Sequence, residues 1–349
     1  MLVYVMATVS SCFLSIFSNL IFKLKDKNSF LKVFISILPL TIVSAIRYGV
    51  GWDYFKIYTY GFYYNAMDGK EYFGEHAFNL FNKLIYRFTT NVDWLFIICS
   101  VIIAIYLSKA ISEQSKNITM SILLVFLSRY FFLSMNIVRQ GIAMAIILYS
   151  LKYIKLKKFK LYLVHILLAT SIHHMAAIFI PFYFIANIDF SKGHNKLLIV
   201  FSPAIIIIGQ KIILKIIDGT KYASYFGSRF DGNEFLLTEI VINSIILLFA
   251  IINYKKNNDR YYYIYFNMQL IAFIISIFSK FIPVVDRIIW FFSVQQIFFI
   301  PLILKNYKRE EKLIVGYTIF VALVGVVIMQ TILSDSYSVL PYQTIFNKI

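Results

Sequence analysis

The chain has 349 residues, of which 60% are hydrophobic, 18% aromatic and only 15% charged. A soluble domain of this length cannot bury so much apolar surface, so the composition excludes a soluble protein and predicts an all-α, polytopic membrane bundle. The 34 Lys and Arg against 17 Asp and Glu give a net charge of +17. These cations lie mostly in short loops between apolar segments, which excludes nucleic-acid binding as their explanation.

Nine apolar segments predict membrane-crossing helices. In chain order they are 2–22, 31–46, 93–108, 118–135, 137–154, 235–253, 261–279, 288–304 and 312–333. The first lacks a basic region and a small-residue cleavage site, so we expect a retained span rather than a signal peptide. Cys12 and Cys99 fall inside spans, which indicates packing rather than a disulfide or a metal site.

The loops between these spans differ in charge, which predicts their sides. Loops 23–32, 109–116, 152–160, 255–260 and 305–312 hold 18 cationic residues in 41 positions, and we expect them in the cytoplasm. The connections 47–91, 136–139, 218–234, 280–287 and 334–349 hold 11 in 90 and should face outward. Both termini are then outside, with ten full crossings and one irregular element.

Loops 152–160 and 255–260 are both predicted to lie in the cytoplasm, so an even number of crossings must separate them. One segment between them is therefore irregular, and there are two candidates for it. Segment 161–187 carries His173 and His174 at its centre and can enter and return as two half-helices. Segment 197–217 contains Pro203 and can instead lie partly in the interface. Both alternatives stay open at this point.

Segment 47–91 is the largest polar stretch and predicts a large outer loop. Its many Tyr, Phe and Trp residues are typical of chain at the level of the lipid headgroups, so we expect short interfacial helices there. No repeat, low-complexity tract or flexible linker divides the chain, which predicts a single transmembrane domain over 1–349.

Four arginines occupy outer ends of spans or outer loops: Arg47, Arg139, Arg229 and Arg287. The planar, permanently charged guanidinium suits a pyrophosphate group at a membrane surface, although arginines at helix ends also contact lipid headgroups. Arg129 sits deeper, inside 118–135, and needs a partner or a wet cavity.

Histidines and carboxylates supply the candidates for proton transfer and sugar binding. His173 and His174 interrupt an apolar segment, where a neutral imidazole can act as a general base. Asp53, Glu75 and Asp286 are carboxylates on the outer side that can bind sugar hydroxyls. Nothing has the spacing of a nucleotide-phosphate loop, a dinucleotide fingerprint or a zinc ligand set, so no cofactor is predicted.

Four stretches, in order, resemble motifs of the EpsG family, which belongs with the Wzy-type O-antigen and capsule polymerases. They are Arg47-Tyr48-Gly49-Val50-Gly51-Trp52-Asp53-Tyr54 followed by Tyr58; Glu75-His76-Ala77-Phe78-Asn79-Leu80; Asn136-Ile137-Val138-Arg139-Gln140-Gly141-Ile142-Ala143; and His174-Met175-Ala176-Ala177 followed by Pro181. Ala176 stands where the family usually has Ser. Weaker likeness extends to Asp286-Arg287 and Leu340-Pro341-Tyr342.

The resemblance implies a fold like the multi-span glycosyltransferase class C (GT-C-like) and an enzyme, a glycosyltransferase that polymerises undecaprenyl-pyrophosphate-linked oligosaccharide repeat units. The work would occur at the outer face of a bacterial cytoplasmic membrane, with O-antigen, capsule or exopolysaccharide as product. Arg139 and Arg287, with Arg47 and Arg229, would bind the pyrophosphate. His174 would accept the proton from the acceptor hydroxyl, with His173 as the fallback. Asp53, Glu75, Tyr54 and Gln140 would form the sugar subsite, where aromatic rings can stack on pyranose faces.

Other functions compatible with the sequence are a lipid-linked oligosaccharide flippase or transporter, and a membrane glycan ligase or a glycosyl or acyl transferase. A transporter is expected to show paired halves, which this chain lacks. The expected partners are the lipid-linked oligosaccharide, membrane lipid, and a chain-length regulator and a flippase, with no nucleic acid.

Overall fold

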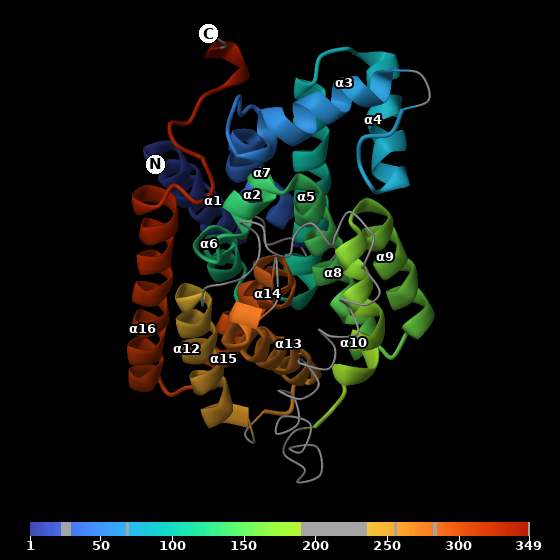
Figure 1. Ribbon diagram of the computed structural model, residues 1–349. Helices are drawn as coiled ribbons and strands as arrows, with labels where there is room; N and C mark the ends of the chain where they lie inside the picture. The colour runs from blue at the N-terminus through green and yellow to red at the C-terminus, as the bar shows by residue number, and fades with distance from the viewer. Residues whose placement is uncertain (22–28, 68–69, 190–235, 255–256, 282–284, 348–349) are drawn as a thin grey trace. The chain divides into compact units, whose positions relative to one another are not determined.

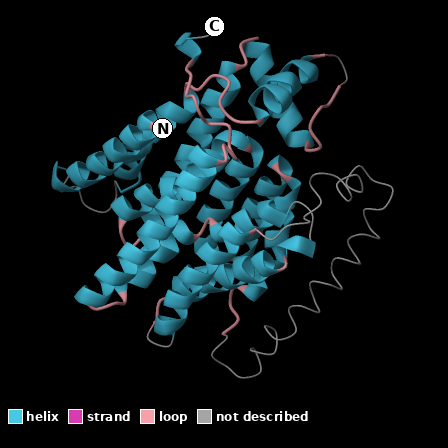
Figure 2. Ribbon diagram, turned by 60° about the vertical axis from the view of Figure 1, so that its left-hand side comes forward, coloured by secondary structure: helices cyan, strands magenta, loops and turns pink. Residues whose placement is uncertain are grey.

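The computed structural model describes residues 1–21, 29–67, 70–189, 236–254, 257–281 and 285–347. Figure 2 shows that the regular structure of these residues is helical. No β-strand occurs among them, although an isolated antiparallel bridge joins Arg47 and Thr344. The predicted all-α class is confirmed for the part of the chain that the structure describes.

The chain divides into two compact units by packing. The first unit comprises Met1–Ile180 and Val321–Ile349, and the second comprises Pro181–Phe320. The prediction of one functional domain over 1–349 stays a prediction.

The first unit contains most of the helices that are labelled in Figure 1. They are α1 (Leu2–Ile21), α2 (Ser29–Ala45), a π-helical turn (Tyr54–Thr59) that continues into α3 (Tyr60–Ala66), α4 (His76–Phe88), α5 (Asp93–Gln114), α6 (Ile118–Leu127), α7 (Tyr130–Asn136), α8 (Val138–Lys155), α9 (Phe159–Ile172) and a 3₁₀ turn (His174–Ile178).

The remaining helices belong wholly or partly to the second unit. They are α10 (Phe179–Ile185), which begins in the first unit, α12 (Leu237–Asn253), α13 (Arg260–Ile277), a 3₁₀ turn (Ser279–Phe281), α14 (Val285–Ser293), α15 (Gln296–Lys305) and α16 (Arg309–Val327). Helix α16 crosses into the first unit, where a π-helical turn (Ile328–Leu333) and a short 3₁₀ turn (Ile345–Asn347) follow.

Two of the described helices, Asp93–Gln114 and Arg309–Leu333, are long and apolar enough to cross a membrane, and two bent helix pairs raise the number to four. Shorter apolar helices occupy the predicted spans 2–22, 31–46 and 235–253. The structure therefore supports a helical membrane protein, and the predicted total of ten crossings stays a prediction.

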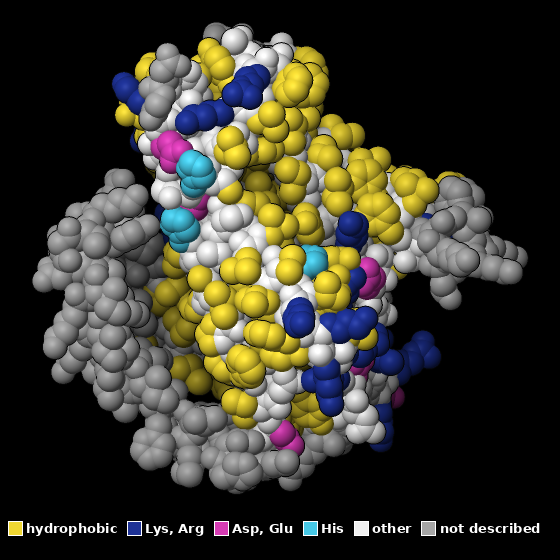
Figure 3. All heavy atoms as spheres, turned by 90° about the vertical axis from the view of Figure 1, so that its right-hand side faces the viewer, with side chains coloured by type: hydrophobic (Ala, Val, Ile, Leu, Met, Phe, Trp, Pro, Cys, Tyr) yellow, Lys and Arg dark blue, Asp and Glu magenta, His cyan; other side chains and the backbone are white. Residues whose placement is uncertain are grey.

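Exposed apolar side chains mark the surface that such a protein presents to lipid. On α1, Leu2, Met6, Val9 and Phe13 are each at least 60% exposed and recur every three or four residues, so they share one face of the helix. Figure 3 shows apolar side chains over much of the face that it draws, with Lys and Arg grouped at the lower right and others at the top. A patch of this kind is unstable in water and suits the hydrocarbon of a bilayer.

The segment 118–135, predicted as one continuous span, is instead two helices. Helices α6 and α7 are bent by 52° at Arg129, whose backbone adopts the left-handed conformation with φ +68°. Its buried guanidinium donates a hydrogen bond to Oε1 of Gln330 at 2.9 Å, and the Tyr337 hydroxyl donates to the same oxygen at 2.6 Å. The structure thus supplies a partner for Arg129 that the sequence could not name.

The segment 161–187 is also interrupted, at one of the two positions that the sequence offered for an irregular element. Helix α9 ends at Ile172, His173 is extended with φ −150° and ψ 110°, and the chain resumes as a 3₁₀ turn and then α10. The alternative element, 197–217, lies outside the described residues.

The predicted span 288–304 bends by 43° between α14 and α15 in the second unit. Four fully buried amides gather there: Asn243, Gln269, Gln295 and Gln296. Nε2 of Gln269 donates to Oδ1 of Asn243 at 2.9 Å, and the two glutamines of the bend donate to Oε1 of Gln269 at 2.8 and 3.1 Å. A buried amide needs such partners in an apolar interior, so the network ties the bend to α12 and α13.

The segment after α16 forms a strap across the first unit. The Tyr4 hydroxyl of α1 donates to the Val339 carbonyl at 2.7 Å, and the N–H of Gly51 donates to the Ser338 carbonyl at 2.8 Å. The Ile345 N–H donates to the Ile46 carbonyl at 2.9 Å. The strap therefore holds the N-terminal helix and the segment after α2 together.

We expect Gln330→Leu to destabilise the protein by about 1–3 kcal/mol, because it leaves the buried Arg129 and the Tyr337 hydroxyl without a shared acceptor. The check is thermal unfolding of the purified protein in detergent. Met329→Leu, at the exposed neighbouring position, is the matched control. Equal unfolding temperatures for wild type and both variants would show that the Gln330 contact contributes nothing.

Candidate functional site

A buried carboxylate, Glu75, joins three segments of the first unit. It precedes α4, and its side chain is 6% exposed. Oε2 accepts a hydrogen bond from Nη1 of Arg139 on α8, and Oε1 lies 3.3 Å from Nδ1 of His173. The backbone N–H of His174 donates to the same Oε1 at 3.3 Å. The structure thus brings together an acid, an arginine and the histidine pair that the sequence singled out.

The start of α8 is positioned by a close approach of α7. A Cβ atom at Gly141 would lie 2.8 Å from Cα of Ser134, so a larger residue there would push the helices apart. The Tyr130 hydroxyl also donates to the Gly141 carbonyl at 2.6 Å. Arg139, in the first turn of α8, is thereby fixed, and its backbone N–H donates to the Tyr58 hydroxyl at 3.2 Å.

Two aromatic rings surround the Arg139 guanidinium. The guanidinium carbon lies 4.8 Å from the ring centre of Phe73 and 5.9 Å from that of Phe78, distances at which a cation is attracted to an aromatic ring. The Asn79 side chain accepts from the N–H of Phe73 at 2.9 Å and donates to its carbonyl at 2.7 Å. Asn79 therefore fixes the loop that carries both Phe73 and Glu75.

The charges of the site keep Glu75 ionised. Burial raises the pKa of Glu75, but the hydrogen bond from His173 and the charge of Arg139 lower it to about 2. A carboxylate at Nδ1 favours the histidine tautomer that carries its proton on Nδ1, which leaves Nε2 as a proton acceptor. Burial also raises the pKa of Tyr58 to about 12 against the opposing charge of Arg139, so Tyr58 stays a neutral phenol.

The two histidines have different surroundings. His173 is 8% exposed and its Nδ1 faces the carboxylate of Glu75. The imidazole of His174 is exposed, and this residue reaches Glu75 through its backbone N–H. Among the described residues, a carboxylate therefore orients the ring of His173.

Arg47 and Tyr54 lie in a buried cluster at the end of α2, which is linked to the surroundings of Arg139 because the Phe96 ring meets the Tyr58 ring edge-on at 6.3 Å. Arg47 is 1% exposed; its guanidinium donates to the carbonyls of Ser44 and Met135 and lies 4.7 Å from the Phe96 ring. The ring of Tyr54 stacks on the ring of Phe96, with the ring centres 4.1 Å apart. In this conformation both residues face protein.

Two further predicted sugar-site residues flank the start of α8. The half-buried Asp53 is held by its backbone N–H, which donates to Oδ1 of Asn136 at 3.1 Å. Gln140 follows Arg139 directly and is 1% exposed. The approach of Asp53 to the start of α8 comes from the tight turn at Gly51, whose φ of +103° and close approach to the Met135 carbonyl favour glycine.

The other predicted arginines cannot be placed beside Arg139. Arg287 and Asp286 are neighbours in the first turn of α14, in the second unit. Arg229 lies outside the described residues. Their predicted contacts with pyrophosphate stay predictions.

Sequence reasoning did not assign roles to Tyr58, Phe73, Phe78 and Asn79, which form the surroundings of Arg139. Two of these, Phe78 and Asn79, follow Glu75 within the stretch that carried the resemblance, and Tyr58 follows the first such stretch. For these three residues, the available signal was their position in or directly after the stretches that resemble the family. Phe73 carried no comparable signal.

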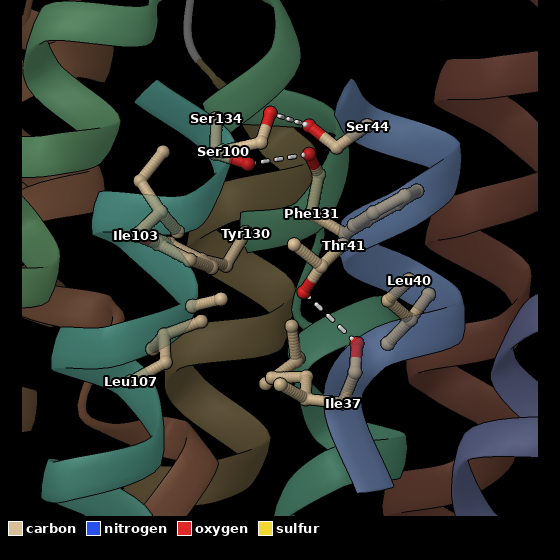
Figure 4. Close-up of a pocket in the computed structure, with 12 residues that line it drawn as sticks. Ile37, Leu40, Thr41, Ser44, Ser100, Ile103, Leu107, Tyr130, Phe131 and Ser134 are labelled. Carbon is tan, nitrogen blue, oxygen red and sulfur yellow. Dashed lines mark hydrogen bonds between the residues drawn. The ribbon is translucent and has the colours of Figure 1, made fainter. Parts of the chain in front are cut away.

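A small pocket between α2, α5 and α7 is drawn in Figure 4. Its volume, about 20 Å³, has room for about one water molecule, which excludes a sugar or a lipid headgroup. Its hydroxyl groups already bind within the protein, as Ser44 and Ser100 do to each other at 2.9 Å. Among the described residues, no group of three or more His, Cys, Asp or Glu is placed to hold a metal ion.

Comparison with known families gives one match, which covers most of the chain. The model of the EpsG family matches residues 30–344. Comparisons with curated proteins and with solved structures return no match. The matched range includes Glu75, Arg139, His173 and His174.

Glu75→Gln should destabilise the protein most at neutral pH, because it removes the anion that pairs with Arg139. The folded-state pKa of Glu75 is lowered from 4.5 to about 2, so its contribution is fully present above about pH 4.5 and is lost as the pH falls through 2. That shift corresponds to a contribution on the order of 3 kcal/mol. The measurement is thermal unfolding at pH 7 and pH 3, where we expect the gap between wild type and variant to narrow. A gap that is equal at both pH values would contradict this role of the charge.

Proposed function

Because the chain belongs to the EpsG family, a family of Wzy-like polysaccharide polymerases and glycosyltransferases, we propose that it joins undecaprenyl-pyrophosphate-linked oligosaccharide repeat units. The product would be O-antigen, capsule or exopolysaccharide. The reaction would take place at the outer face of the bacterial cytoplasmic membrane.

One observation carries the proposal beyond the family: Arg139 and His173 meet at the carboxylate of Glu75. A fixed guanidinium binds phosphate oxygens, and an imidazole oriented by a carboxylate accepts a proton near neutral pH. Transfer of a glycan from a pyrophosphate to a hydroxyl needs both groups in one place.

In the proposed reaction, the acceptor hydroxyl of one lipid-linked repeat unit attacks the anomeric carbon of the growing glycan. A new glycosidic C–O bond forms, and the bond from that carbon to the pyrophosphate oxygen breaks. Its electron pair leaves with undecaprenyl pyrophosphate, whose charge Arg139 stabilises. The hydroxyl proton goes to a histidine. Because the pyrophosphate is already a good leaving group, the protein contributes mainly position and charge.

We assign the proton acceptor to the histidine pair and place His173 ahead of His174. The reason is the contact of Nδ1 of His173 with Glu75, which favours the tautomer with a basic Nε2. Because Nε2 is buried, His173 would meet the acceptor hydroxyl only after the chain around it moves. His174, the first candidate from the sequence, remains the alternative, since its exposed ring can reach a substrate at the surface.

The further ligand contacts are proposed from the sequence. Arg287 and Arg229 would add contacts to the pyrophosphate, and Asp53, Tyr54 and Gln140 would contact sugar. Arg47 would join the pyrophosphate site only after exchanging its bonds to the Ser44 and Met135 carbonyls.

The proposed setting is a GT-C-like bundle of about ten crossings, with segment 47–91 as the large outer loop and both termini outside. A flippase would supply the lipid-linked repeat units and a chain-length regulator would limit the product. No described feature favours a transporter, a ligase or an acyltransferase over the polymerase. Analysis of the glycans that accumulate separates these functions, because loss of a polymerase leaves single repeat units.

Arg139→Ala should abolish the polysaccharide ladder in the producing cells and leave single repeat units, because the leaving pyrophosphate loses its cation. Arg87→Ala, which removes an exposed arginine near the end of α4, is the matched control and should leave the ladder intact. The measurement is gel analysis of the glycans at equal membrane levels of each protein. A normal ladder in Arg139→Ala would remove Arg139 from the mechanism.

His173→Gln should lower the polymerisation rate by a factor of about 10²–10⁴, as expected on loss of a general base. His174→Gln should lower it much less if His173 accepts the proton. The rates are compared in membranes supplied with lipid-linked repeat units. A large loss in His174→Gln with a normal rate in His173→Gln would reverse the assignment.

A further inference from the structure

Three tyrosines form a surface cluster beside the candidate site, and we call it the tyrosine platform: Tyr60 and Tyr64 on α3, and Tyr72 in the loop before α4. The rings of Tyr60 and Tyr64 are stacked, with centres 5.9 Å apart and planes 26° apart. The ring of Tyr72 meets both edge-on, at 5.2 and 5.9 Å. Tyr60 is 55% exposed, so much of its ring is available to a ligand.

The platform is held rigidly by the rest of the first unit. The N–H of Tyr72 donates to Oδ1 of the buried Asn65 at 2.8 Å, and the Tyr72 hydroxyl donates to the Lys56 carbonyl at 3.3 Å. A Cβ atom at Gly61 would lie 2.6 Å from the Tyr72 ring and 2.5 Å from the Phe73 ring. Glycine at this position therefore lets α3 lie directly on the loop.

The platform is continuous with the surroundings of Arg139. The ring of Tyr72 meets that of Phe73 edge-on at 5.1 Å, and Phe73 lies 4.8 Å from the Arg139 guanidinium carbon. A chain of rings thus leads from an exposed surface to the arginine that we assign to the pyrophosphate.

Polar groups border the platform, which distinguishes it from a surface that faces the hydrocarbon of the bilayer. The Lys70 ammonium lies 5.2 Å from the Tyr64 ring, and Glu71 pairs with His76 at 2.7 Å. The hydroxyl groups of Tyr60 and Tyr64 have no hydrogen bond within the described residues, so they can bind a ligand.

The adjacent helix α4 presents a surface of the opposite character. Leu80, Leu84 and Phe88 recur every four residues and are 61%, 50% and 84% exposed. This apolar stripe has the composition of a membrane contact, whereas the platform combines ring faces with hydroxyl groups and charges. The membrane is therefore better matched to α4 than to the tyrosine platform.

We propose that the tyrosine platform binds sugar rings of the growing glycan, as a second glycan-binding surface outside the site of bond formation. Tyrosine suits this ligand because its ring packs on the apolar face of a pyranose while its hydroxyl binds sugar oxygens. By holding the glycan between additions, the platform favours further extension over release. This inference rests on the proposed function.

The test compares the double variant Tyr60→Ala/Tyr64→Ala with wild type. Tyr72 is left unchanged because it packs on Phe73. Tyr63→Ala is the matched control, since Tyr63 is an exposed tyrosine of α3 whose ring meets Phe62 rather than the platform. Glycan length is read from the ladder at equal membrane levels of the three proteins.

We expect the double variant to give a ladder shifted to shorter chains, with repeat units still joined, and the control to match wild type. A ladder of normal length in the double variant would overturn the inference. A wild-type protein that makes no ladder would instead contradict the proposed function.

A binding measurement separates the two proposals further, because it requires no polymerisation. The probe is the cell's own polysaccharide, released from its carrier, titrated onto the full-length protein in detergent. Loss of two stacking rings should weaken binding by about tenfold. Equal affinity in wild type and double variant would overturn the inference.

Discussion

The first unit depends on one physical constraint, which is that a charged or polar group removed from water needs a partner. Glu75 and Arg139 meet this requirement for each other, and the remaining carboxylate oxygen is used by His173 and the His174 backbone. Breaking such a pair by removing one partner is costly, because the other charge stays buried. The loop before α4, the start of α8 and the end of α9 are therefore held at one point, and the same contact that stabilises these segments orients the groups proposed for catalysis.

The two units meet the same requirement with different chemistry. The bend between α14 and α15 is held by neutral amides, with Gln269 accepting from Gln295 and Gln296. The bend between α6 and α7 is held by a cation, Arg129, on the neutral acceptor Gln330. An amide network has no net charge to compensate, so it fixes a bend without attracting an ionic ligand. The guanidinium of Arg139 instead has aromatic and anionic neighbours, Phe73 and Glu75, within the protein.

Sequence patterns predicted the helical class, most helix positions and the residues of the candidate site, because hydropathy and the local stretches around Glu75, Arg139 and His174 are visible in one dimension. They did not predict the break at Arg129, since 118–135 is apolar apart from that residue and a few hydroxyl side chains, and its acceptor Gln330 lies 201 positions away. Glu75 was expected among the carboxylates on the outer side, but it is buried. The sequence did not show this burial because the partner that permits it, Arg139, is also distant in sequence. For the same reason, the structure was needed to show that Glu75 orients the ring of His173.

The strap after α16 has a consequence for the order in which the protein can be completed. Residues 46–51 bind to residues 338–345 through backbone hydrogen bonds, yet all of 181–320 is synthesised between them. During translation, the segment after α2 cannot make these hydrogen bonds until the ribosome has made the whole second unit. The first unit therefore begins to form early and closes late, after the second unit has been synthesised.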